Sequence, residues 1–315
     1  MYKEESGKME GIAAVLTKAI AFVAIIVMGY VLKRIHVFKK DDFYLLSKVV
    51  IRITLPAAIV TNFSQISMEN SLLFMCVLGI ACNLVFVAAG YLINVKHTPM
   101  DKAFGMLNLA GYNIGNFTMP FVQSFLGPVG FAVTSLFDAG NSVMCTGITY
   151  TLASAAAGKS QKGSKLGMLK TLFSSVPFDT YLIMTALAIL RVKLPDVVLS
   201  FAATAGGANA FLALFMIGIG FDIRLAEKDK IHKIVRMLAI RYGFALVMSV
   251  GFFFLSPFSL EIRQALAILM FGPIASVSPA FTGKLDGDIE LSSAINSISI
   301  VISILSITAA LILVL

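Results

Sequence analysis

Long apolar stretches dominate this chain and leave little room between them for a water-soluble domain. Ten such stretches follow one another, each near the length of about 20 residues that an α-helix needs to cross a bilayer. They cover residues 11–32, 43–64, 70–94, 103–126 and 129–156 in the first half, and 174–191, 196–221, 234–255, 262–283 and 289–314 in the second. The chain is 58% hydrophobic and only 13% charged, whereas an ordinary globular domain is about 25% charged. The sequence therefore predicts an all-α polytopic membrane protein with ten transmembrane helices.

The longest polar interval, Gly158 to Gly167, lies between the fifth and sixth stretches. It divides the chain into a first five-helix repeat, residues 1–157, a basic linker, residues 158–167, and a second repeat, residues 168–315. Because each repeat has an odd number of spans, the two repeats must have opposite orientations in the membrane. We therefore expect an inverted repeat, as in many secondary transporters.

The distribution of Lys and Arg predicts the orientation, because cytoplasmic loops carry the excess of these residues. One set of loops contains Lys33, Arg34, Lys39, Lys40, Lys96, Lys102, Lys159, Lys162, Lys165, Arg224, Lys228, Lys230, Lys233, Arg236 and Lys284. The alternate set contains only Lys3, Lys8, Arg191, Lys193 and Arg263. We predict a multi-pass protein of the cell membrane with the linker inside and both termini outside the cytoplasm.

Several function classes find no support in the sequence. The net charge of +8 comes from short gaps between apolar runs, so no nucleic-acid partner is expected. The three cysteines lie within apolar runs, and the three histidines lie in or beside loops without a H-E-x-x-H motif. No metal, cofactor or catalytic cluster is indicated, so we do not expect an enzyme.

Two of the ten stretches are interrupted in the same way, from Ala110 to Pro120 and from Phe271 to Pro279. Proline lacks an N–H and suits the first turn of a helix, so Pro120 and Pro279 should each begin a second half-helix. Thr118 and Ser278 precede them and should cap free N–H groups. Two helix N-termini at one point would attract a carboxylate. A matched pair of broken spans indicates a transporter's binding site, whereas one proline alone is more often a kink.

Weak internal similarity supports the repeat. Pro120 in the fourth span corresponds to Pro279 in the ninth, and the sequence AGNS at 139–142 in the fifth span corresponds to AINS at 294–297 in the tenth. The two matches have the same order and corresponding positions in the two halves. Together they indicate an inverted-topology repeat.

The segment Tyr112-Asn113-Ile114-Gly115-Asn116 with Pro120, and the later Asp138-Ala139-Gly140-Asn141, resemble the auxin efflux carrier family in its compact bacterial form, which is malate or malonate permease-like. The resemblance covers essentially the whole chain. It implies a secondary transporter whose fourth and ninth spans unwind and cross at their prolines beside the substrate. Bacterial relatives are associated with malate, malonate or similar organic acids, and plant relatives with the auxin anion. The long hydrophilic loop of many plant members is absent, so nothing here favours auxin itself.

Polar side chains at membrane depth are the candidate ligands. Asn113, Asn116, Asn141 and Asn296 must form hydrogen bonds there, either with a substrate carboxylate, with an unwound backbone or between helices. The full set predicted to bind substrate is Asn113, Gly115, Asn116, Thr118, Pro120, Asn141, Ser276, Ser278, Pro279 and Asn296.

Asp138 is the candidate for ion coupling or gating, because it should lie about 15 Å into the fifth span. Arg52 should reach a similar depth in the second span, where it is a partner for Asp138, a ligand for the substrate anion or a structural charge. Lys18, Lys48 and Arg241 are expected to extend to a membrane interface.

These features predict a secondary active transporter for a small organic anion such as a carboxylate, working by alternating access and driven by H⁺, Na⁺ or the membrane potential. One moving bundle should include the second, third, seventh and eighth spans. A cation/proton antiporter of similar crossed-helix design is the alternative within transport. A membrane enzyme or a channel is less favoured. Membrane lipid is an expected partner, and the sequence also allows a homodimer.

Overall fold

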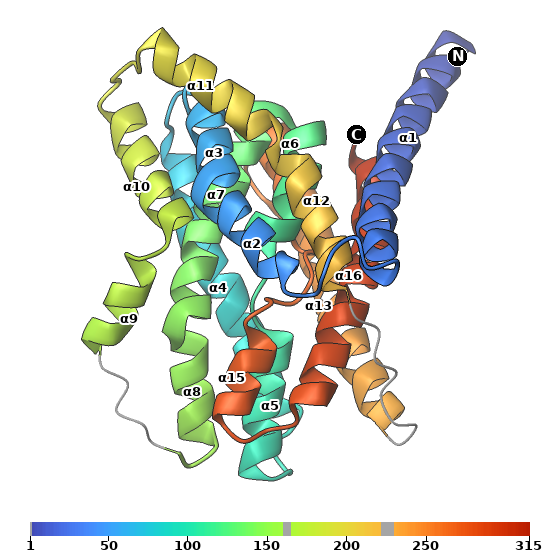
Figure 1. Ribbon diagram of the computed structural model, residues 1–315, viewed down its shortest axis with the longest axis vertical. Helices are drawn as coiled ribbons and strands as arrows, with labels where there is room; N and C mark the ends of the chain where they lie inside the picture. The colour runs from blue at the N-terminus through green and yellow to red at the C-terminus, as the bar shows by residue number, and fades with distance from the viewer. Residues whose placement is uncertain (1, 160–164, 222–229) are drawn as a thin grey trace.

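The computed structural model describes residues 2–159, 165–221 and 230–315, and all regular structure in these ranges is helical. Both chain termini lie at the same end of an elongated bundle (Figure 1). Part of the predicted basic linker, residues 160–164, and the cations Arg224 and Lys228 lie outside the described residues.

The first half folds into helices that follow the predicted spans closely. These are α1 (Tyr2–Arg34), α2 (Asp42–Val49), a π-helical turn η1 (Val50–Thr54), α3 (Leu55–Phe63), α4 (Asn70–Leu92), α5 (Pro99–Leu109), a second π-helical turn η2 (Ile114–Thr118), α6 (Met119–Phe125), α7 (Gly127–Val143), η3 (Met144–Ile148) and α8 (Thr149–Ala156).

The described residues of the second half also form helices. Its helices are α9 (Lys165–Leu172), α10 (Val176–Ile189), α11 (Asp196–Gly207), α12 (Asn209–Gly220), α13 (Ile231–Leu255), α14 (Leu260–Leu269), α15 (Ser278–Lys284) and α16 (Ile289–Val314).

Six helical segments within the described residues are long and apolar enough to cross a membrane: Ala13–Arg34, Asp42–Phe63, Asn70–Leu92, Asp196–Gly220, Ile231–Leu255 and Ile289–Val314. They match six of the predicted spans. The predicted fourth and ninth spans are shorter helices because each is broken, into α5 and α6 and into α14 and α15. The prediction of an all-α polytopic membrane protein is confirmed at this level.

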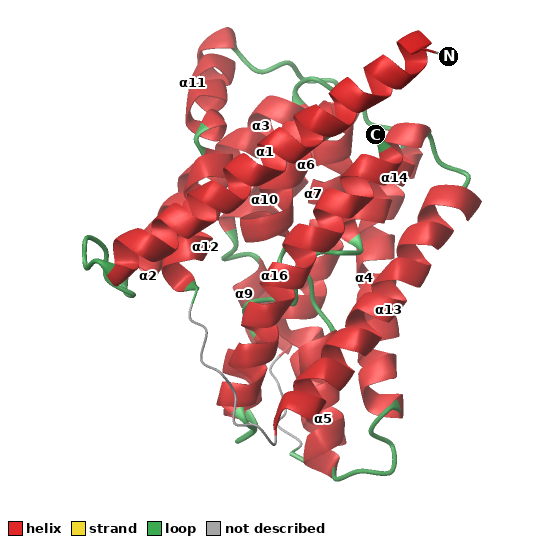
Figure 2. Ribbon diagram, turned by 90° about the vertical axis from the view of Figure 1, so that its right-hand side faces the viewer, coloured by secondary structure: helices red, strands yellow, loops and turns green. Residues whose placement is uncertain are grey.

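The helices pack as two groups. In one group α1 packs on α12, α3 packs on α10 and α11, and α2 packs on α12. In the other, α4 packs on α5 and α7, α14 packs on α7 and α13, and α15 packs on α16 (Figures 1 and 2). The prediction that the second, third, seventh and eighth spans form one bundle is wrong. The second and seventh spans belong to the first group, whereas α4 and α13 belong to the second.

Close contact between α4 and α7 supports the second group. A Cβ atom added at Gly140 of α7 would lie 2.0 Å from the carbonyl oxygen of Cys76, and one at Gly79 of α4 would lie 2.2 Å from that of Phe137. Small residues let membrane helices approach to backbone contact. These two glycines therefore fix the spacing of the helices that carry Asn83 and Asn141.

Candidate functional site

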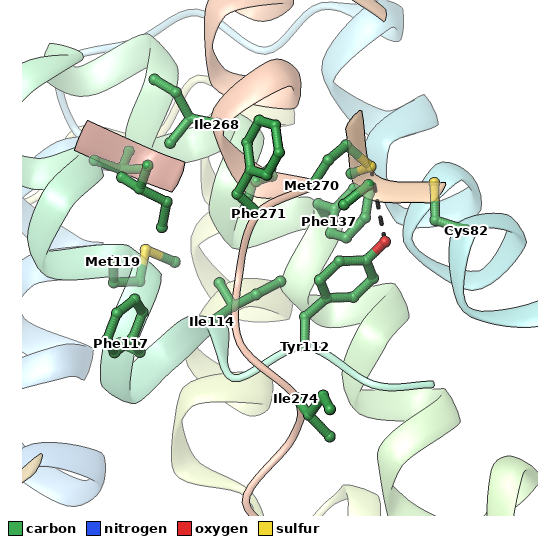
Figure 3. Close-up of a cluster of buried hydrophobic side chains, with 14 of the residues drawn as sticks. Cys82, Tyr112, Ile114, Phe117, Met119, Phe137, Ile268, Met270, Phe271 and Ile274 are labelled. Atoms are coloured by element: carbon green, nitrogen blue, oxygen red, sulfur yellow. Dashed lines mark hydrogen bonds between the residues drawn. The ribbon is translucent and has the colours of Figure 1, made fainter. Parts of the chain in front are cut away.

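The two broken spans meet inside the bundle. The extended segment after α5 runs from Ala110 to Asn113, and the backbone N–H of Asn113 donates to the carbonyl of Pro273 in the other break, with an N···O distance of 2.8 Å. Gly111 has φ +80°, and a Cβ there would lie 2.7 Å from the Cβ of Ala275. Only glycine fits a left-handed conformation at so close a crossing. Figure 3 shows Ile114 and Tyr112 beside Ile274 at this point.

Pro120 and Pro279 lie in the first turns of α6 and α15, as predicted. The predicted caps are wrong. The π-helical turn η2 extends the α6 helix back to Ile114, so Thr118 is inside a helix, and its hydroxyl donates to the carbonyl of Asn113 at 3.4 Å. Ser278 is the first residue of α15, whose N-cap is Val277 without a side-chain hydrogen bond.

Asn141 and Asn83 hold the first break. The Oδ1 of Asn141 accepts from the N–H of Tyr112 at 3.0 Å, and its Nδ2 donates to the Tyr112 carbonyl at 2.9 Å. The Oδ1 of Asn83 on α4 accepts from the N–H of Gly111 at 2.7 Å. These amides replace the hydrogen bonds that an unbroken helix would have made, which a buried backbone requires.

Asn296 holds the second break in the corresponding way. Its Nδ2 donates to the carbonyls of Ile274 and Ala275 at 2.9 and 3.1 Å. The hydroxyl of Ser299 accepts from the N–H of Ile274 at 3.2 Å. Of the alternatives left open for Asn141 and Asn296, the structure therefore has both bridging an unwound backbone.

Arg241 is the cation at the crossing. It is fully buried, and its guanidinium donates to the carbonyls of Leu109, Gly111 and Gly272 at 2.6, 3.1 and 3.2 Å. The guanidinium carbon also lies 4.1 Å from the ring centroid of Phe86 and 4.3 Å from that of Tyr112. Arginine suits this position because its planar group can stack on rings while donating in several directions. The expectation that Arg241 extends to an interface is wrong.

Asp138 on α7 is 8% exposed, and both of its carboxylate oxygens accept hydrogen bonds. Oδ1 accepts from Asn141 at 2.9 Å, and Oδ2 accepts from the hydroxyl of Tyr181 on α10 at 3.0 Å. Tyr181 belongs to the first helix group and Asp138 to the second, so this bond joins the groups.

Of the three roles left open for Arg52, pairing with Asp138 is not found in the structure. Arg52 is exposed, and among the described residues it forms no ion pair with Asp138. Val50 and Thr54 are the buried residues of η1, so the intervening Arg52 faces away from the interior.

A cavity of about 430 Å³ adjoins the crossing and is lined by residues of α3, α7, both breaks, α15 and the α9–α10 junction. It includes six of the predicted residues: Asn113, Gly115, Asn116, Asp138, Asn141 and Ser276. The other predicted residues, Thr118, Pro120, Ser278, Pro279, Asn296 and Arg52, do not line it. That the lining residues bind substrate stays a prediction.

The cavity extends toward the end of the bundle opposite the termini, where the exposed Lys284 at the end of α15 lines it. On the other side of the crossing, buried side chains including Phe117, Met119 and Ile268 fill the space (Figure 3). The described conformation is therefore accessible from one end.

The sequence interpretation missed Arg241, Asn83, Tyr181 and Lys284. Arg241 lies about 15 Å along α13 from Ile231, the same depth that identified Asp138. Applying the depth criterion to every charged residue would have found it. Tyr181 carries no such signal, because its partner comes from another helix.

No group of three or more potential metal-ligating His, Cys, Asp or Glu residues occurs in the described part of the chain. No curated protein matches the sequence. The profile of the family described as membrane transport protein matches residues 14–311, nearly the whole chain. This match confirms the resemblance at the level of the family, and since the family is one of transporters it also confirms that the chain is not an enzyme. The chain therefore belongs to the membrane transport protein family, the auxin efflux carriers.

Proposed function

We propose that this chain is a secondary transporter that moves a small organic anion by alternating access, with ten spans arranged as two inverted repeats of five. The observation that carries the proposal is the 430 Å³ cavity beside two broken helices that cross at the Asn113–Pro273 hydrogen bond. Irregular backbone at membrane depth is tolerated where it lines a cavity, and crossed broken helices are typical of transporter sites.

The lining of the cavity favours an anion. Asn113 and Asn116 contribute side-chain amides for which no hydrogen-bond partner is found among the described residues. Each amide nitrogen can donate to a carboxylate. Lys284 adds a positive charge at the accessible end, which attracts anions from solution. A cavity of this size accommodates a small dicarboxylate or monocarboxylate.

Asp138 supports coupling to an ion. It lines the same cavity, and a Cβ added at Gly115 would lie 3.6 Å from its Oδ2. A carboxylate at this depth marks an ion or proton pathway by default. Its bond to Tyr181 also lets its protonation influence the contact between the two helix groups.

Corresponding contacts in the two halves support the inverted repeat. Asn141, in the fifth span, bonds the backbone of the first break at Tyr112. Asn296, at the equivalent place in the tenth span, bonds the backbone of the second break at Ile274 and Ala275. Pro120 lies in the first turn of α6, which η2 precedes, and Pro279 lies in the first turn of α15.

Uptake into proteoliposomes tests this function. Labelled dicarboxylates and monocarboxylates would be presented with and without pH and sodium gradients, and we expect accumulation of at least one of them. Esters of that substrate should bind poorly. Asn116→Ala should weaken affinity by roughly 5- to 150-fold, since a hydrogen bond to a charged ligand contributes about 1–3 kcal/mol. Asn62→Ala is the control, because Asn62 bonds its own helix at Ala58 and lies outside the cavity.

Two outcomes would contradict the proposal. Exchange of protons for a cation with no organic anion transported would favour the antiporter, for which Asp138 would carry the exchanged proton. Downhill flux that no gradient can drive uphill would favour a channel.

A further inference from the structure

A second, smaller cavity lies at the end of the bundle opposite the termini, away from the crossing. Its volume is about 230 Å³, and it is formed by the α4–α5 connection and the first turns of α5, α13 and α16. Its polar lining consists of Asn94, His97, Asp101, Lys233, Arg236 and Asp288. It shares no lining residue with the cavity proposed for transport.

The cations of this cavity have capacity left for a ligand. Within the described part of the chain, Lys233 makes no hydrogen bond or ion pair, and Arg236 makes one hydrogen bond, from Nη2 to the carbonyl of Ile93 at 2.8 Å. The other guanidinium N–H groups of Arg236 have no partner there. His97 adds a further ring nitrogen at the rim. Arg and Lys with unused donors are the usual ligands of phosphate oxygens.

The two carboxylates are already engaged. Asp101 accepts from the hydroxyl of Thr98 at 2.7 Å. Asp288 forms an ion pair with Lys230 at 2.9 Å and accepts from the N–H of Leu291 at the start of α16. Lys233 and Arg236 equal these two acids in number, and Lys230, which pairs with Asp288 but does not line the cavity, adds a third cation beside it. The N-termini of three helices add partial positive charge at the same place.

The surroundings favour a lipid as the source of the phosphate. The helix ends that form the cavity place it where the bundle leaves the membrane. Large apolar side chains are exposed close to the cavity in sequence: Leu92, at the end of α4, is 63% exposed, and Val235, in the first turns of α13, is 60% exposed. They provide a surface for acyl chains beside a pocket that contains two cations with unused donors, and cations between transmembrane helices are typical of headgroup binding.

We propose that this cavity binds the headgroup phosphate of an anionic phospholipid through Lys233 and Arg236. The site is independent of the transported substrate, because it lies outside the cavity at the crossing. A lipid held there would contact the α4–α5 connection, α5, α13 and α16, all of the second helix group, and would stabilise the ends of these helices against one another.

Titration of the purified, detergent-solubilised protein with phosphatidylglycerol tests the proposal, with the melting temperature as the readout. We expect saturable stabilisation of the wild type and none with phosphatidylcholine. Lys233→Gln should raise the half-saturating concentration about fivefold, and Lys233→Gln with Arg236→Gln about 25-fold, since each cation near an anionic lipid contributes about 1 kcal/mol. Lys233→Gln breaks no contact among the described residues, so its fold should be unaffected.

The control is the pair Lys39→Gln with Lys170→Gln, which removes two exposed cations outside the cavity. It should leave the half-saturating concentration of phosphatidylglycerol unchanged. The site would be overturned if the control raised the half-saturating concentration as much as the Lys233 and Arg236 variants do, or if those variants did not raise it. If glycerol phosphate stabilised the protein as much as phosphatidylglycerol does, the cavity would be a site for a soluble phosphate, and the proposal that it binds a lipid would be wrong.

Discussion

At the crossing, a single buried cation satisfies carbonyl groups that no intrahelical N–H can reach. The end of α5 and both extended segments expose carbonyls at Leu109, Gly111 and Gly272, and Arg241 donates to all three. Its charge is compensated by these carbonyl dipoles and by the faces of Phe86 and Tyr112. Arg241 is therefore a positioning residue for the broken helices, because it lines the crossing but not the cavity.

Replacing Arg241 with Gln should destabilise the protein and abolish transport. The shorter amide cannot reach three carbonyls, and each buried polar group left unsatisfied costs about 1–3 kcal/mol. Arg241→Lys should retain part of the stability, since an ammonium can bond some carbonyls but cannot stack as a plane. Thermal unfolding in detergent and uptake in proteoliposomes would measure both effects.

Arg52→Gln is the matched control for Arg241, because Arg52 lies within a predicted span but is exposed. It should leave the melting temperature and uptake near wild-type values. If Arg52→Gln were as damaging as Arg241→Gln, the assignment of the structural cation to Arg241 would be wrong.

Asp138→Asn should remove ion coupling while leaving the fold intact. An amide oxygen can still accept from Tyr181 or Asn141, so the local hydrogen bonds can persist, but the neutral side chain cannot exchange a proton. Accumulation driven by a pH or sodium gradient should be lost, whereas downhill exchange of substrate should continue. Asp196→Asn, at an exposed acid, should behave as wild type. Gradient-driven accumulation by Asp138→Asn would contradict a coupling role.

Depth in the membrane was readable from the sequence, but the direction of each side chain was not. Counting residues into a span located Asp138 in the interior, and the same count placed Arg52 there. The face of a helix that points inward depends on its neighbours, and η1 turns Arg52 outward. Tyr181 became a partner of Asp138 only through the packing of α10 against α7.

At the scale of elements, the positions of the two breaks were predictable from the sequence. The residues at which the helices resume after each break were not. Proline and glycine located both interruptions, because their backbone preferences are local. The cap at Thr118 failed because η2 adds a π-helical turn before α6, which moves Thr118 into the helix, and the cap at Ser278 failed because α15 begins one residue earlier than expected, at Ser278 itself.

Gly140→Ala should destabilise the protein by forcing α7 away from α4. The new Cβ would lie 2.0 Å from the backbone oxygen of Cys76, and a backbone atom cannot rotate aside. Overpacking costs about 1–3 kcal/mol, and the shift would also draw Asn83 away from its bond to Asn141. We expect a lower melting temperature and reduced uptake.

Gly243→Ala provides the comparison, because a Cβ at Gly243 of α13 meets no atom within 4 Å. It should leave stability unchanged or raise it slightly, since alanine favours a helix over glycine by about 1 kcal/mol. An equal loss of stability in both variants would mean that helix contact at Gly140 is not the cause.

At the scale of the whole molecule, the sequence located the spans but not their grouping. Hydropathy measures each segment separately, whereas grouping arises from contacts between segments far apart in the chain, such as α1 with α12. The expectation that the third and eighth spans join the second and seventh failed for this reason. The predicted number of spans is even and therefore places both termini on one side, and both lie at the same end of the bundle (Figure 1).

The remaining question at this scale is which end of the bundle faces the cytoplasm, and the Lys/Arg asymmetry predicts the end opposite the termini. A cysteine-free background would replace Cys76, Cys82 and Cys145 with alanine. Single cysteines would then be placed at Val197, which is 81% exposed where α11 begins, and at Lys96, in the exposed α4–α5 connection at the other end.

An impermeant thiol reagent added to intact cells should label Val197→Cys, and should label Lys96→Cys only after the membrane is permeabilised. The physical reason is that cationic loops are retained on the cytoplasmic side during insertion. If intact cells were labelled at Lys96→Cys and not at Val197→Cys, the described fold would still be consistent with the result, because both termini would still lie at one end. The orientation would be reversed, however, and the cavity beside Lys284 would open to the outside in the described conformation. The labelling pattern therefore decides whether this conformation presents the proposed anion site to the cytoplasm or to the exterior.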